Sequence, residues 1–567
     1  MTEIYCQDLE SAAARLDDAL RFDRIPHTTK LFTDFLYHYD RVARFYPDYG
    51  RNAAPLTSRA IQIAQGRFDR DGVADALEHI NRRSASSELT FENISTLRRP
   101  DSVAVVTGQQ AGLFTGPLYT IFKALTTIKL ARCLSDQGVH AVPVFWVASE
   151  DHDFDEVNHC TIVDTDGRLS EVRYQGCGHS QDLPVGEIQL CEGIVQKIDE
   201  LIGTLPHSEF LDGLRNDLTA SYHANAGFAE AFSSLMARLF RDYGVVLLDP
   251  LDKGLKEIAA PLYVQAIEKS GEIAQALTRR SAELVDAGYH AQVHVSDDMV
   301  PLFIMDQGRR VALTSRDNRF FVKGSDRSFS RDELIELARN CSSCFSPNVT
   351  LRPVVQDFLL PTAAYIGGPA EIAYFAQIRA VYETLGRPLP CVLPRASMTV
   401  IEARHQKTLN KYSLNLADFF DGLHNAISKV VEKSLDRETS AIFEQTESSL
   451  NSQLDRLEQA LRRTDGTLVA SVRLAREKIL HQIDHLKTRF VHSSARRDEA
   501  AYRQVERACT TLLPEKNLQE RVLNVYYFLA RYGPGLIDEL YEATEIGFSN
   551  HKLVYIGAAA SQVVNVP

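Results

Sequence analysis

An acidic run with one histidine is the segment of this sequence best suited to moving protons. Residues Ser149–Glu156 hold five carboxylates and His152 within eight positions. Crowded like charges raise carboxyl pKa values, which suits a general acid or base, and carboxylates are also the ligands that Mg²⁺ prefers. A solvated acidic loop is the alternative reading of such a run. We take Glu150, Asp151, His152 and Asp153 as the candidate catalytic residues.

A glycine-rich segment, Thr107–Pro117, could bind an anion. Its glycines at 108, 112 and 116 would let the backbone approach a ligand, and the helix expected after it would offer unpaired amides to a phosphate or carboxylate. The segment matches neither the P-loop motif nor GxGxxG. A helix-capping turn that binds no ligand is therefore an alternative interpretation. The candidate ligand-binding residues here are Gly108, Gln109, Gln110, Gly112, Thr115, Gly116 and Lys123, with Thr120 close by.

A third group of polar residues lies within Tyr365–Gln377. Glycine and proline open a helix there, and Glu371, Tyr374 and Gln377 recur at three-residue spacing, so they nearly share a helix face. Arg395 follows the apolar pair Val392–Leu393, and a guanidinium group can fork onto a carboxylate or phosphate. A surface ion pair is as good an explanation of that arginine. The substrate-binding candidates here are Tyr365, Glu371, Tyr374, Gln377 and Arg395.

Buried strands must position these groups. The apolar runs 103–107, 142–148 and 244–249 are typical of buried parallel strands, and the helical pattern of Leu118–Leu134 lies between the first two. Such a strand–helix–strand unit predicts a parallel crossover. Ligands of open parallel sheets bind beyond the carboxyl ends of the strands. We therefore expect the three polar groups to converge on one cleft.

The remaining segments are of other kinds. The first hundred residues have helical periodicity, and the last fifty are apolar enough to return to the core. Residues 160–190 predict a hairpin turning at Asp166–Gly167, and 288–345 predict antiparallel strands through 291–295, 302–305 and 310–314. A heptad-like stripe after Asn410 predicts two long helices, 440–463 and 467–492, turning at 464–466 and packed antiparallel. We expect this stripe to be buried between them.

The composition excludes some classes of function. The net charge is −13, from 62 basic and 75 acidic residues, so nucleic acid is a poor first partner. No signal segment and no membrane-length apolar stretch is present, so we expect a cytoplasmic location and no membrane partner. The nine cysteines are expected to be free thiols, and the single CxxC pair, Cys341 and Cys344, is weak evidence for a metal site.

Three motifs together resemble one family. They are TGQQxGLxxGPxxTxxK at Thr107–Lys123, PVFWxAxEDHDxxE at Pro143–Glu156, and YxGGPxExxYxxQ at Tyr365–Gln377 with PRxS at Pro394–Ser397. These motifs are similar to those of the cysteine ligases of bacillithiol biosynthesis, and the resemblance covers nearly the whole chain. The resemblance implies a Rossmann-like α/β core with two connecting insertions, a C-terminal antiparallel coiled coil, and a homodimer. It also implies that cysteine is added to glucosaminyl-malate through an amide bond to the glucosamine amine.

On that basis we expect the following division of the chain. The core is 1–158, 206–270 and 346–405; the insertions are 159–205 and 271–345; the coiled coil is 406–510; and 511–567 returns to the core.

The resemblance also suggests roles for the candidate residues. A free carboxylate must be activated, so ATP, with Mg²⁺ as a further candidate, is expected at the glycine loop and Lys123. The acidic group would take the proton of the amine, Arg395 a malate or cysteine carboxylate, and Glu371 the cysteine ammonium. Two alternatives stay open, namely another adenylating ligase or nucleotidyltransferase, and a non-enzymatic interaction protein that works through its coiled coil.

Overall fold

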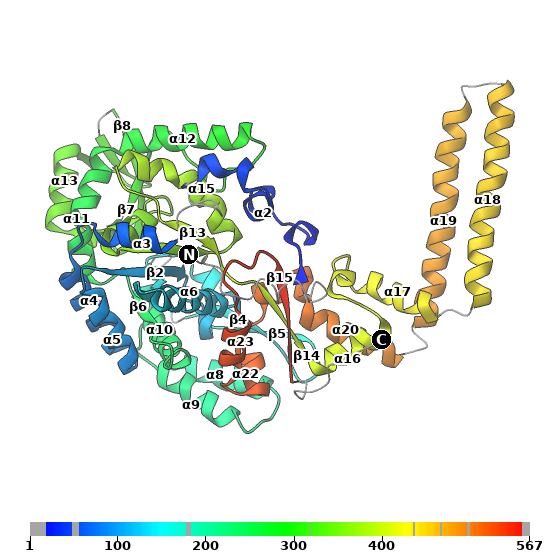
Figure 1. Ribbon diagram of the computed structural model, residues 1–567, viewed down its shortest axis with the longest axis horizontal. Coiled ribbons are helices and arrows are strands. Elements are labelled where there is room, and N and C mark those ends of the chain that lie inside the picture. The colour runs from blue at the N-terminus through cyan, green and yellow to red at the C-terminus, as the bar shows by residue number, and fades with distance from the viewer. Residues whose placement is uncertain are drawn as a thin grey trace. The chain divides into compact units, whose positions relative to one another are not determined.

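The computed structural model describes residues 19–47, 56–176, 178, 183–317, 319–434, 437–464, 468–495 and 499–557 (Figure 1). Its chain forms two compact units. The first contains the described residues up to Thr399 together with Glu520–Val554, and the second contains Val400–Gln519 with the residues from Tyr555. In the part of the chain described, no helix is long and apolar enough to cross a membrane.

A five-stranded parallel sheet forms the centre of the first unit. Its order is β13-β12-β2-β3-β6, and every neighbouring pair is parallel. The strands are β2 (Ser102–Gln109), β3 (His140–Val147), β6 (Val246–Leu248), β12 (Thr362–Gly367) and β13 (Cys391–Pro394). The predicted strands 103–107, 142–148 and 244–249 are therefore confirmed as parallel neighbours. Their continuous apolar runs are explained by burial on both faces of the sheet.

Helices cover this sheet. The crossover helix α6 (Tyr119–Asp136) joins β2 to β3 and packs on both, as predicted. Asn81 lies in α4 and satisfies the edge strand β6, because its amide donates to Leu247 O at 2.8 Å and its oxygen accepts from Leu247 N at 3.1 Å. The other helices before the first insertion are α2 (Lys30–Tyr37), α3 (Leu56–Ala64), α4 (Arg70–Arg83) and α5 (Glu88–Leu97).

Two insertions leave the sheet. The first holds the hairpin of β4 (His159–Val163) and β5 (Leu169–Arg173), whose tip contains Gly167 at φ 84°, as the sequence predicts. The second holds an antiparallel sheet of order β10-β9-β8-β7-β11. Its strands are β7 (Met299–Asp306), β8 (Arg309–Arg316), β9 (Arg319–Val322), β10 (Ser328–Ser330) and β11 (Phe345–Pro347).

One predicted strand is wrong. Residues 291–295 form a loop that bends at 292–293 and belong to no strand. The backbone of Val293 is satisfied by a side chain instead, since the amide of Gln377 donates to Val293 O at 2.7 Å and its oxygen accepts from Val293 N at 2.9 Å. A side chain 84 positions away has thus replaced the ladder that the alternating pattern suggested.

Further helices connect these sheets, and the end of the chain returns to the first unit. The connecting helices are α7 (Phe154–Val157), α8 (Gly193–Thr204), α9 (Leu211–Ser221), α10 (Phe228–Leu239), α11 (Lys253–Glu268), α12 (Ser270–Asp286), α13 (Arg331–Asn340), α14 (Arg352–Leu359) and α15 (Pro369–Thr384). The returning segment supplies α22 (Tyr526–Tyr532), α23 (Leu536–Ala543) and β15 (His551–Ile556), and β15 pairs with β1 (Ala19–Leu20). The part of the predicted segment 511–567 that belongs to the first unit is Glu520–Val554, whereas 511–519 belongs to the second unit.

The expectation that all cysteines are free thiols is wrong for at least three of them. Cys341 and Cys344 form a disulfide, and Cys191 is disulfide-bonded too. A short turn between α13 and β11 places the Cα atoms of Cys341 and Cys344 5.5 Å apart, which is within bonding range. Within the described residues, the cysteines that form no disulfide are Cys133, Cys160, Cys391 and Cys509.

The second unit is helical. It contains α16 (Ala403–Tyr412), α17 (Leu423–Ser434), α18 (Arg437–Thr464), α19 (Val469–Ala495) and α20 (Glu499–Leu512). Contacts of Glu458 with Arg473 and of Asn451 with Arg476 run in opposite chain directions, so α18 and α19 are antiparallel, as predicted. Asp465 and Gly466 of the predicted turn lie outside the described residues.

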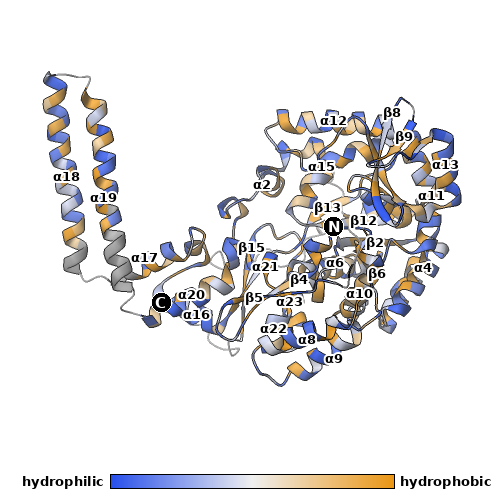
Figure 2. Cartoon of the chain, turned by 180° about the vertical axis from the view of Figure 1, so that it is seen from behind, coloured by the Kyte–Doolittle hydropathy of each residue, from blue (hydrophilic) through white to orange (hydrophobic). Residues whose placement is uncertain are grey.

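The apolar stripe of this hairpin is only partly buried, and here the expectation was wrong. Leu454 and Val472 are 9% and 6% exposed, whereas Leu457 and Leu486 are 47% and 57% exposed. Figure 2 shows apolar and polar residues mixed along both helices. Two helices present only one mutual seam, so the rest of a wide apolar stripe stays accessible.

The hairpin should respond differently to a charge at a buried and at an exposed position of the stripe. We expect Leu454→Asp to lower the thermal midpoint of the α18–α19 hairpin, because it buries an unpaired carboxylate. The matched change Leu457→Asp should leave that midpoint nearly unchanged, since Leu457 is half exposed. Thermal scans followed by circular dichroism would check this, and equal losses in both variants would contradict it.

Candidate functional site

A pocket of about 330 Å³ opens at the carboxyl ends of the parallel strands. The end of β2 contributes Gly108 and Gln109, the end of β3 contributes Trp146, and the end of β12 leads into Gly368. The glycine-loop motif and the Tyr365–Gln377 motif therefore meet in one pocket, as the strand-end argument predicts.

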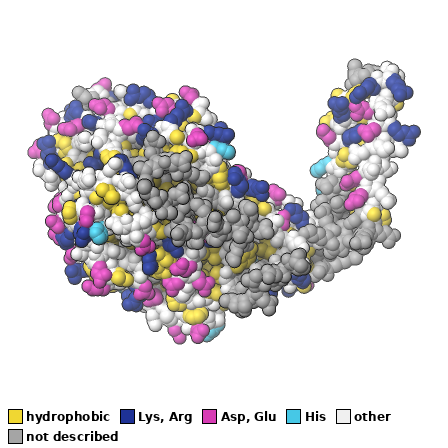
Figure 3. Space-filling model, in the orientation of Figure 1, with side chains coloured by type: hydrophobic (Ala, Val, Ile, Leu, Met, Phe, Trp, Pro, Cys, Tyr) yellow, Lys and Arg dark blue, Asp and Glu magenta, His cyan; other side chains and the backbone are white. Residues whose placement is uncertain are grey.

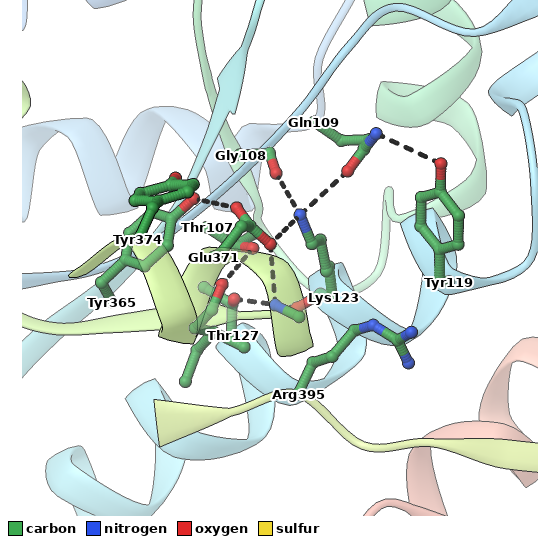
Figure 4. A network of polar contacts seen from close by, with 12 residues as sticks. Thr107, Gly108, Gln109, Tyr119, Lys123, Thr127, Tyr365, Glu371, Tyr374 and Arg395 are labelled. Atoms are coloured by element: carbon green, nitrogen blue, oxygen red, sulfur yellow. Dashed lines mark hydrogen bonds and ion pairs between the residues drawn. The ribbon is translucent and has the colours of Figure 1, made fainter. Parts of the chain in front are cut away.

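Lys123 and Glu371 both line this pocket and form an ion pair, which Figure 4 shows with its neighbouring polar contacts. The Lys123 Nζ atom is 2.5 Å from Glu371 Oε2, and it donates to Gly108 O at 2.7 Å and to Gln109 Oε1 at 2.9 Å. Glu371 also accepts from the Tyr365 hydroxyl at 2.5 Å and from the Gly368 amide at 2.7 Å. Both charges are thus almost fully satisfied inside the protein.

Local sequence explains why these two side chains meet. Lys123 lies in the second turn of α6, after the crossover helix has left β2. Glu371 lies in the first turn of α15, where a carboxylate can accept a free backbone amide and face the positive end of the helix. Pro369 suits the first position of that helix because proline has no backbone N–H group that would need a partner there.

The pKa values follow from this pairing. Burial lowers the pKa of Lys123, and the neighbouring Glu371 opposes that effect. For Glu371 burial acts to raise the pKa, but Lys123 and the Gly368 amide outweigh it, and the pKa is lowered. Glu371 is therefore ionised at neutral pH, and it neutralises the lysine beside it.

Three arginines also line the pocket. Arg352, in the first turn of α14, lies over the rings of Trp146 and Tyr365, at 5.6 and 5.4 Å from their centroids. Arg395 and Arg521 complete the set. The ionisable acids and bases of the lining are then four cations and one carboxylate, although the whole chain carries −13. Basic and acidic side chains are by contrast interspersed on the surface of the first unit that Figure 3 shows.

Sequence reasoning missed Arg352 and Arg521. Each stands at the start of, or within, an ordinary helix, and neither is part of a run of chemistry-bearing residues. Only the fold brings them to Trp146 and Tyr119 at the pocket wall.

Arg395 is held by a buried acidic network. Its Nη2 atom lies 2.8 Å from Glu520 Oε1, and both side chains are less than a tenth exposed, so the surface ion pair considered from sequence is in fact a buried one. Ser397 donates to the same Glu520 oxygen at 2.8 Å and contacts His551 Nδ1 at 2.7 Å. Burial lowers the pKa of His551 to about 4. This imidazole is therefore neutral at pH 7.

The acidic loop joins the site through one side chain. Gln110 lines the pocket, and its amide donates to Asp151 Oδ2 at 2.7 Å and to Glu156 Oε2 at 2.8 Å. Asp151 therefore lies one hydrogen bond behind the pocket wall. Of the acidic motif, Asp151 and Glu156 thus approach the pocket, although only through their hydrogen bonds to Gln110.

The other acidic candidates have different partners. Glu150 is buried and pairs with Lys256 at 2.8 Å. His152 Nδ1 lies 3.2 Å from an Arg310 nitrogen, and Asp153 caps α7 by accepting from Glu156 N at 3.2 Å. Glu150 and His152 thus have separate cationic partners, whereas Asp151 and Glu156 share the amide of Gln110.

The glycine loop does not form the predicted anion cradle. A Cβ atom on Gly112 would lie 2.7 Å from the Cα atom of Gly116, so these glycines allow the chain to fold back on itself. The amide of Leu118 donates to Leu523 O at 2.9 Å and is not available to a ligand. Thr115 is fully buried at φ 82° and does not line the pocket. Gly108 and Lys123 are the parts of the predicted cofactor site that line it.

Two further expectations concern Gln377 as a pocket residue and the acidic loop as a metal site. Gln377 is fully buried and bonds to Val293 and Ser281, so it faces away from the pocket although Tyr374 and Glu371 line it. Within the described residues, no group of three or more His, Cys, Asp or Glu side chains is placed to hold a metal ion. The donor set for Mg²⁺ expected in the acidic loop is thus not assembled by side chains alone, and a nucleotide has no ready phosphate cradle in the glycine loop.

The fold and the pocket define an α/β protein with a Rossmann-like sheet and a cation-rich pocket at the carboxyl ends of its strands. Comparison with known families gives the same architecture. Residues 20–396 match the family description "Bacillithiol biosynthesis BshC, N-terminal Rossmann-like domain", and residues 398–556 match its C-terminal coiled-coil domain. The chain belongs to the BshC family of bacillithiol biosynthesis, so the resemblance and the fold class predicted from sequence are confirmed.

Full-length relatives agree with this membership. The chain is 41% identical over 534 residues to a protein of Koribacter versatilis, covering 93% of this chain and 98% of the relative. It is 38% identical over 525 residues to a protein of Salinibacter ruber, covering 92% and 96%, and 35% identical over 537 residues to one of Solibacter usitatus, covering 95% and 99%. All three carry the name "Putative cysteine ligase BshC", in agreement with the predicted ligase class.

The Lys123–Glu371 pair should matter for stability as well as for binding. In Lys123→Ala the largely buried carboxylate of Glu371 loses its cation. We expect a loss of about 3 kcal/mol in the free energy of unfolding, as for other broken buried pairs. The double variant Lys123→Met/Glu371→Gln should recover much of this loss, because no unpaired charge remains. Urea unfolding would measure both, and additive losses would contradict the prediction.

The buried His551 should make stability depend on pH. Its pKa is about 4 when folded and 6.5 in the unfolded chain, so the unfolded chain binds more protons between these values, and stability falls as the pH falls through this window. The full effect is about 3 kcal/mol. Replacing His551 by Gln should remove it, as measured by thermal midpoints between pH 4.5 and 7.5.

A buried carboxyl acts in the opposite sense. Burial raises the pKa of Asp357 to about 6, so its contribution is present at low pH and is lost as the pH rises through 6. The His551 effect must therefore be taken as the difference between variant and parent at each pH. A difference that does not change with pH would rule out the role given to His551.

Proposed function

We propose that this protein joins the carboxyl group of L-cysteine to the amine of glucosaminyl-malate, forming the amide bond that completes bacillithiol. The observation that carries the proposal is that Arg352 and Arg521 line the pocket of a BshC-family chain, and neither has a carboxylate partner among the described residues. A malate conjugate is a dicarboxylate, and a cation-rich pocket suits it. At about 330 Å³ the pocket is near the lower end of ligand sites, which span about 300–1,000 Å³.

The carboxylates of the malate group would bind to Arg352 and Arg521. Arg352 bonds to Gln356 Oε1 at 3.1 Å and reaches the Tyr374 hydroxyl at 3.5 Å, and neither arginine has a carboxylate partner among the described residues. Arg395, which we first assigned this role, is already neutralised by Glu520. Arg395 would instead keep the pocket wall in place and offer hydrogen-bond donors to the ligand.

Glu371 would bind the cysteine ammonium group. Its oxygens already accept from Lys123, Tyr365 and Gly368, but an ionised carboxylate offers about four acceptor positions. Lys123 then acts through Glu371, since it fixes that carboxylate and supplies no free positive charge. Gln109 and Tyr119, which contact each other at 3.4 Å on the pocket wall, would add neutral hydrogen bonds.

Asp151 is the proposed base. The glucosamine amine must be neutral to attack and loses a proton when the amide forms, and a carboxylate near the pocket can accept that proton. Asp151 is half exposed and is oriented by Gln110 and by the His152 amide at 2.8 Å. The free cysteine carboxylate needs activation, and ATP with Mg²⁺ is the proposed source of it.

A homodimer is part of the proposal. The exposed apolar side chains of the hairpin, among them Ile442, Leu457, Leu474 and Leu486, are each about half exposed. A second copy of the same hairpin could cover them in a coiled-coil arrangement.

The test is a reconstituted reaction. Purified protein is incubated with cysteine, glucosaminyl-malate, ATP and Mg²⁺, and the thiol product is detected by mass spectrometry, with each component left out in turn. We expect product only when both substrates are present, and dependence on ATP. ATP turnover that needs neither substrate would instead favour a different adenylating enzyme.

The base is tested by a pair of isosteric changes in one loop. Asp151→Asn should lower kcat about a hundredfold or more, in the range of lost general-base catalysis. The matched control Asp155→Asn removes the same charge from an exposed position in α7 and should change kcat little. Both should keep the parent's thermal midpoint. Full activity of Asp151→Asn would refute the role of this residue without refuting the reaction.

A further inference from the structure

The disulfide between Cys341 and Cys344 lies at an accessible turn. Both residues are partly exposed, and Cys341 Sγ lies 3.7 Å from the hydroxyl of the exposed Ser343. The helix α13 ends at Asn340, and the strand β11 begins at Phe345, directly after the second cysteine. A small thiol can therefore approach the sulfur atoms from solvent, and any change at the turn acts first on β11.

The strand β11 binds two cations, Lys256, which is buried, and Arg310, which is partly buried. Lys256 donates to Phe345 O at 2.6 Å. Arg310 donates to Ser346 Oγ at 2.8 Å and to Pro347 O at 2.9 Å, and its guanidinium group lies 3.7 Å from the centroid of the Phe303 ring. Each residue of this three-residue strand thus binds one of the two cations.

These cations reach the residues on either side of the proposed base. Lys256 pairs with Glu150 at 2.8 Å, and Arg310 contacts His152 Nδ1 at 3.2 Å. Between them lies Asp151, which accepts from the pocket residue Gln110 at 2.7 Å. The segment 150–152 is therefore fastened at both ends to the strand that follows the disulfide.

We propose that Cys341–Cys344 is a thiol–disulfide exchange site for small thiols, and that its oxidation state sets how firmly residues 150–152 are held beside the pocket. The first part stands independently of the reaction proposed above. The second part concerns the same loop, but its readout needs no catalysis.

The exchange is balanced by two small thiols. A thiolate attacks Cys341 Sγ, forms a mixed disulfide and releases Cys344 as a thiolate, which takes up a proton. A second thiol attacks the small-molecule sulfur, which yields the symmetrical small disulfide and the Cys341 thiol. The protein gains two electrons and two protons, and the two thiols are oxidised. Cys344 is the leaving group because a thiolate at Cys341 would face the negative end of α13.

Other cysteines of the described chain provide an internal contrast. Burial raises the pKa of Cys391 to about 12 and of Cys509 to about 11, and it raises that of Cys160 as well. These groups form little thiolate at neutral pH and should react slowly. Exchange should therefore be selective for the CxxC pair over these three cysteines.

The first experiment measures exchange directly. The full-length protein is equilibrated with cysteine and cystine at graded ratios, quenched with acid, alkylated, digested and analysed by mass spectrometry. We expect Cys341 and Cys344 to change state together, with the reduced-to-oxidised ratio following the square of the cysteine concentration divided by that of cystine. In Cys344→Ser, Cys341 should be trapped as a mixed disulfide with cysteine. A pair that keeps one state at all ratios, or no trapping, would overturn the proposal.

The second experiment measures the coupling to the loop. Hydrogen exchange of the peptides covering 148–157 is compared between the oxidised parent and Cys341→Ser/Cys344→Ser, with Cys133→Ser/Cys509→Ser as the matched control. We expect roughly tenfold faster exchange in the first variant, as when a charge-assisted hydrogen bond is loosened, and parental exchange in the control. Peptides of α4, far along the chain, should exchange as in the parent, which separates a local effect from global unfolding. Equal exchange of 148–157 in all three proteins would overturn the coupling, whatever the outcome of the ligase assay.

Discussion

The buried ion pair of Lys123 and Glu371 is the contact on which the rest of the site depends. It joins the crossover helix α6 to the start of α15, and so it fixes the ends of β2 and β12 against each other. Isolated buried charges are costly, and they are tolerated here because Gly108, Gln109, Tyr365 and Gly368 complete their hydrogen bonds. The pocket is consequently built around groups whose geometry is fixed before a ligand binds.

The end of the chain completes the same site. Glu520 neutralises Arg395, and the carboxamide of Asn524 donates to Phe114 O and Gly116 O, both at 2.8 Å. Glu520 thus holds the arginine after β13, and Asn524 holds the turn after β2. Residues Val400–Gln519 of the second unit lie between Arg395 and Glu520 in the sequence. Folding of the second unit and closure of the first are therefore linked through the chain itself. The long helical excursion leaves and re-enters the first unit beside the pocket-lining residues Arg395 and Arg521.

The insertions give the acidic loop its character. Arg310, the partner of His152, comes from strand β8 of the antiparallel sheet. Strand β11 of the same sheet anchors Lys256, the partner of Glu150. Without these partners the loop would resemble the crowded carboxylate run that its sequence suggests. Partners from elsewhere in the fold instead leave Asp151 as the acidic candidate directed at the pocket through Gln110. The hydrogen bond between Gln110 and Asp151 joins this loop to the pocket wall.

The sequence by itself determined the parallel strands, the crossover helix, the hairpins and the long helical pair, because periodicity and apolar runs report local burial directly. It also determined which motifs carry chemistry, and that strand ends would bring Thr107–Lys123 and Tyr365–Gln377 together. It could not decide which polar side chain faces a ligand and which satisfies the fold, since both uses need the same residue types. Gln377, Glu150 and Arg395 are paired with partners 84 to 125 positions away, and only tertiary contacts could show this. Arg352 and Arg521 became visible for the same reason, because a pocket wall assembled from distant strand and helix ends leaves no local pattern in the chain.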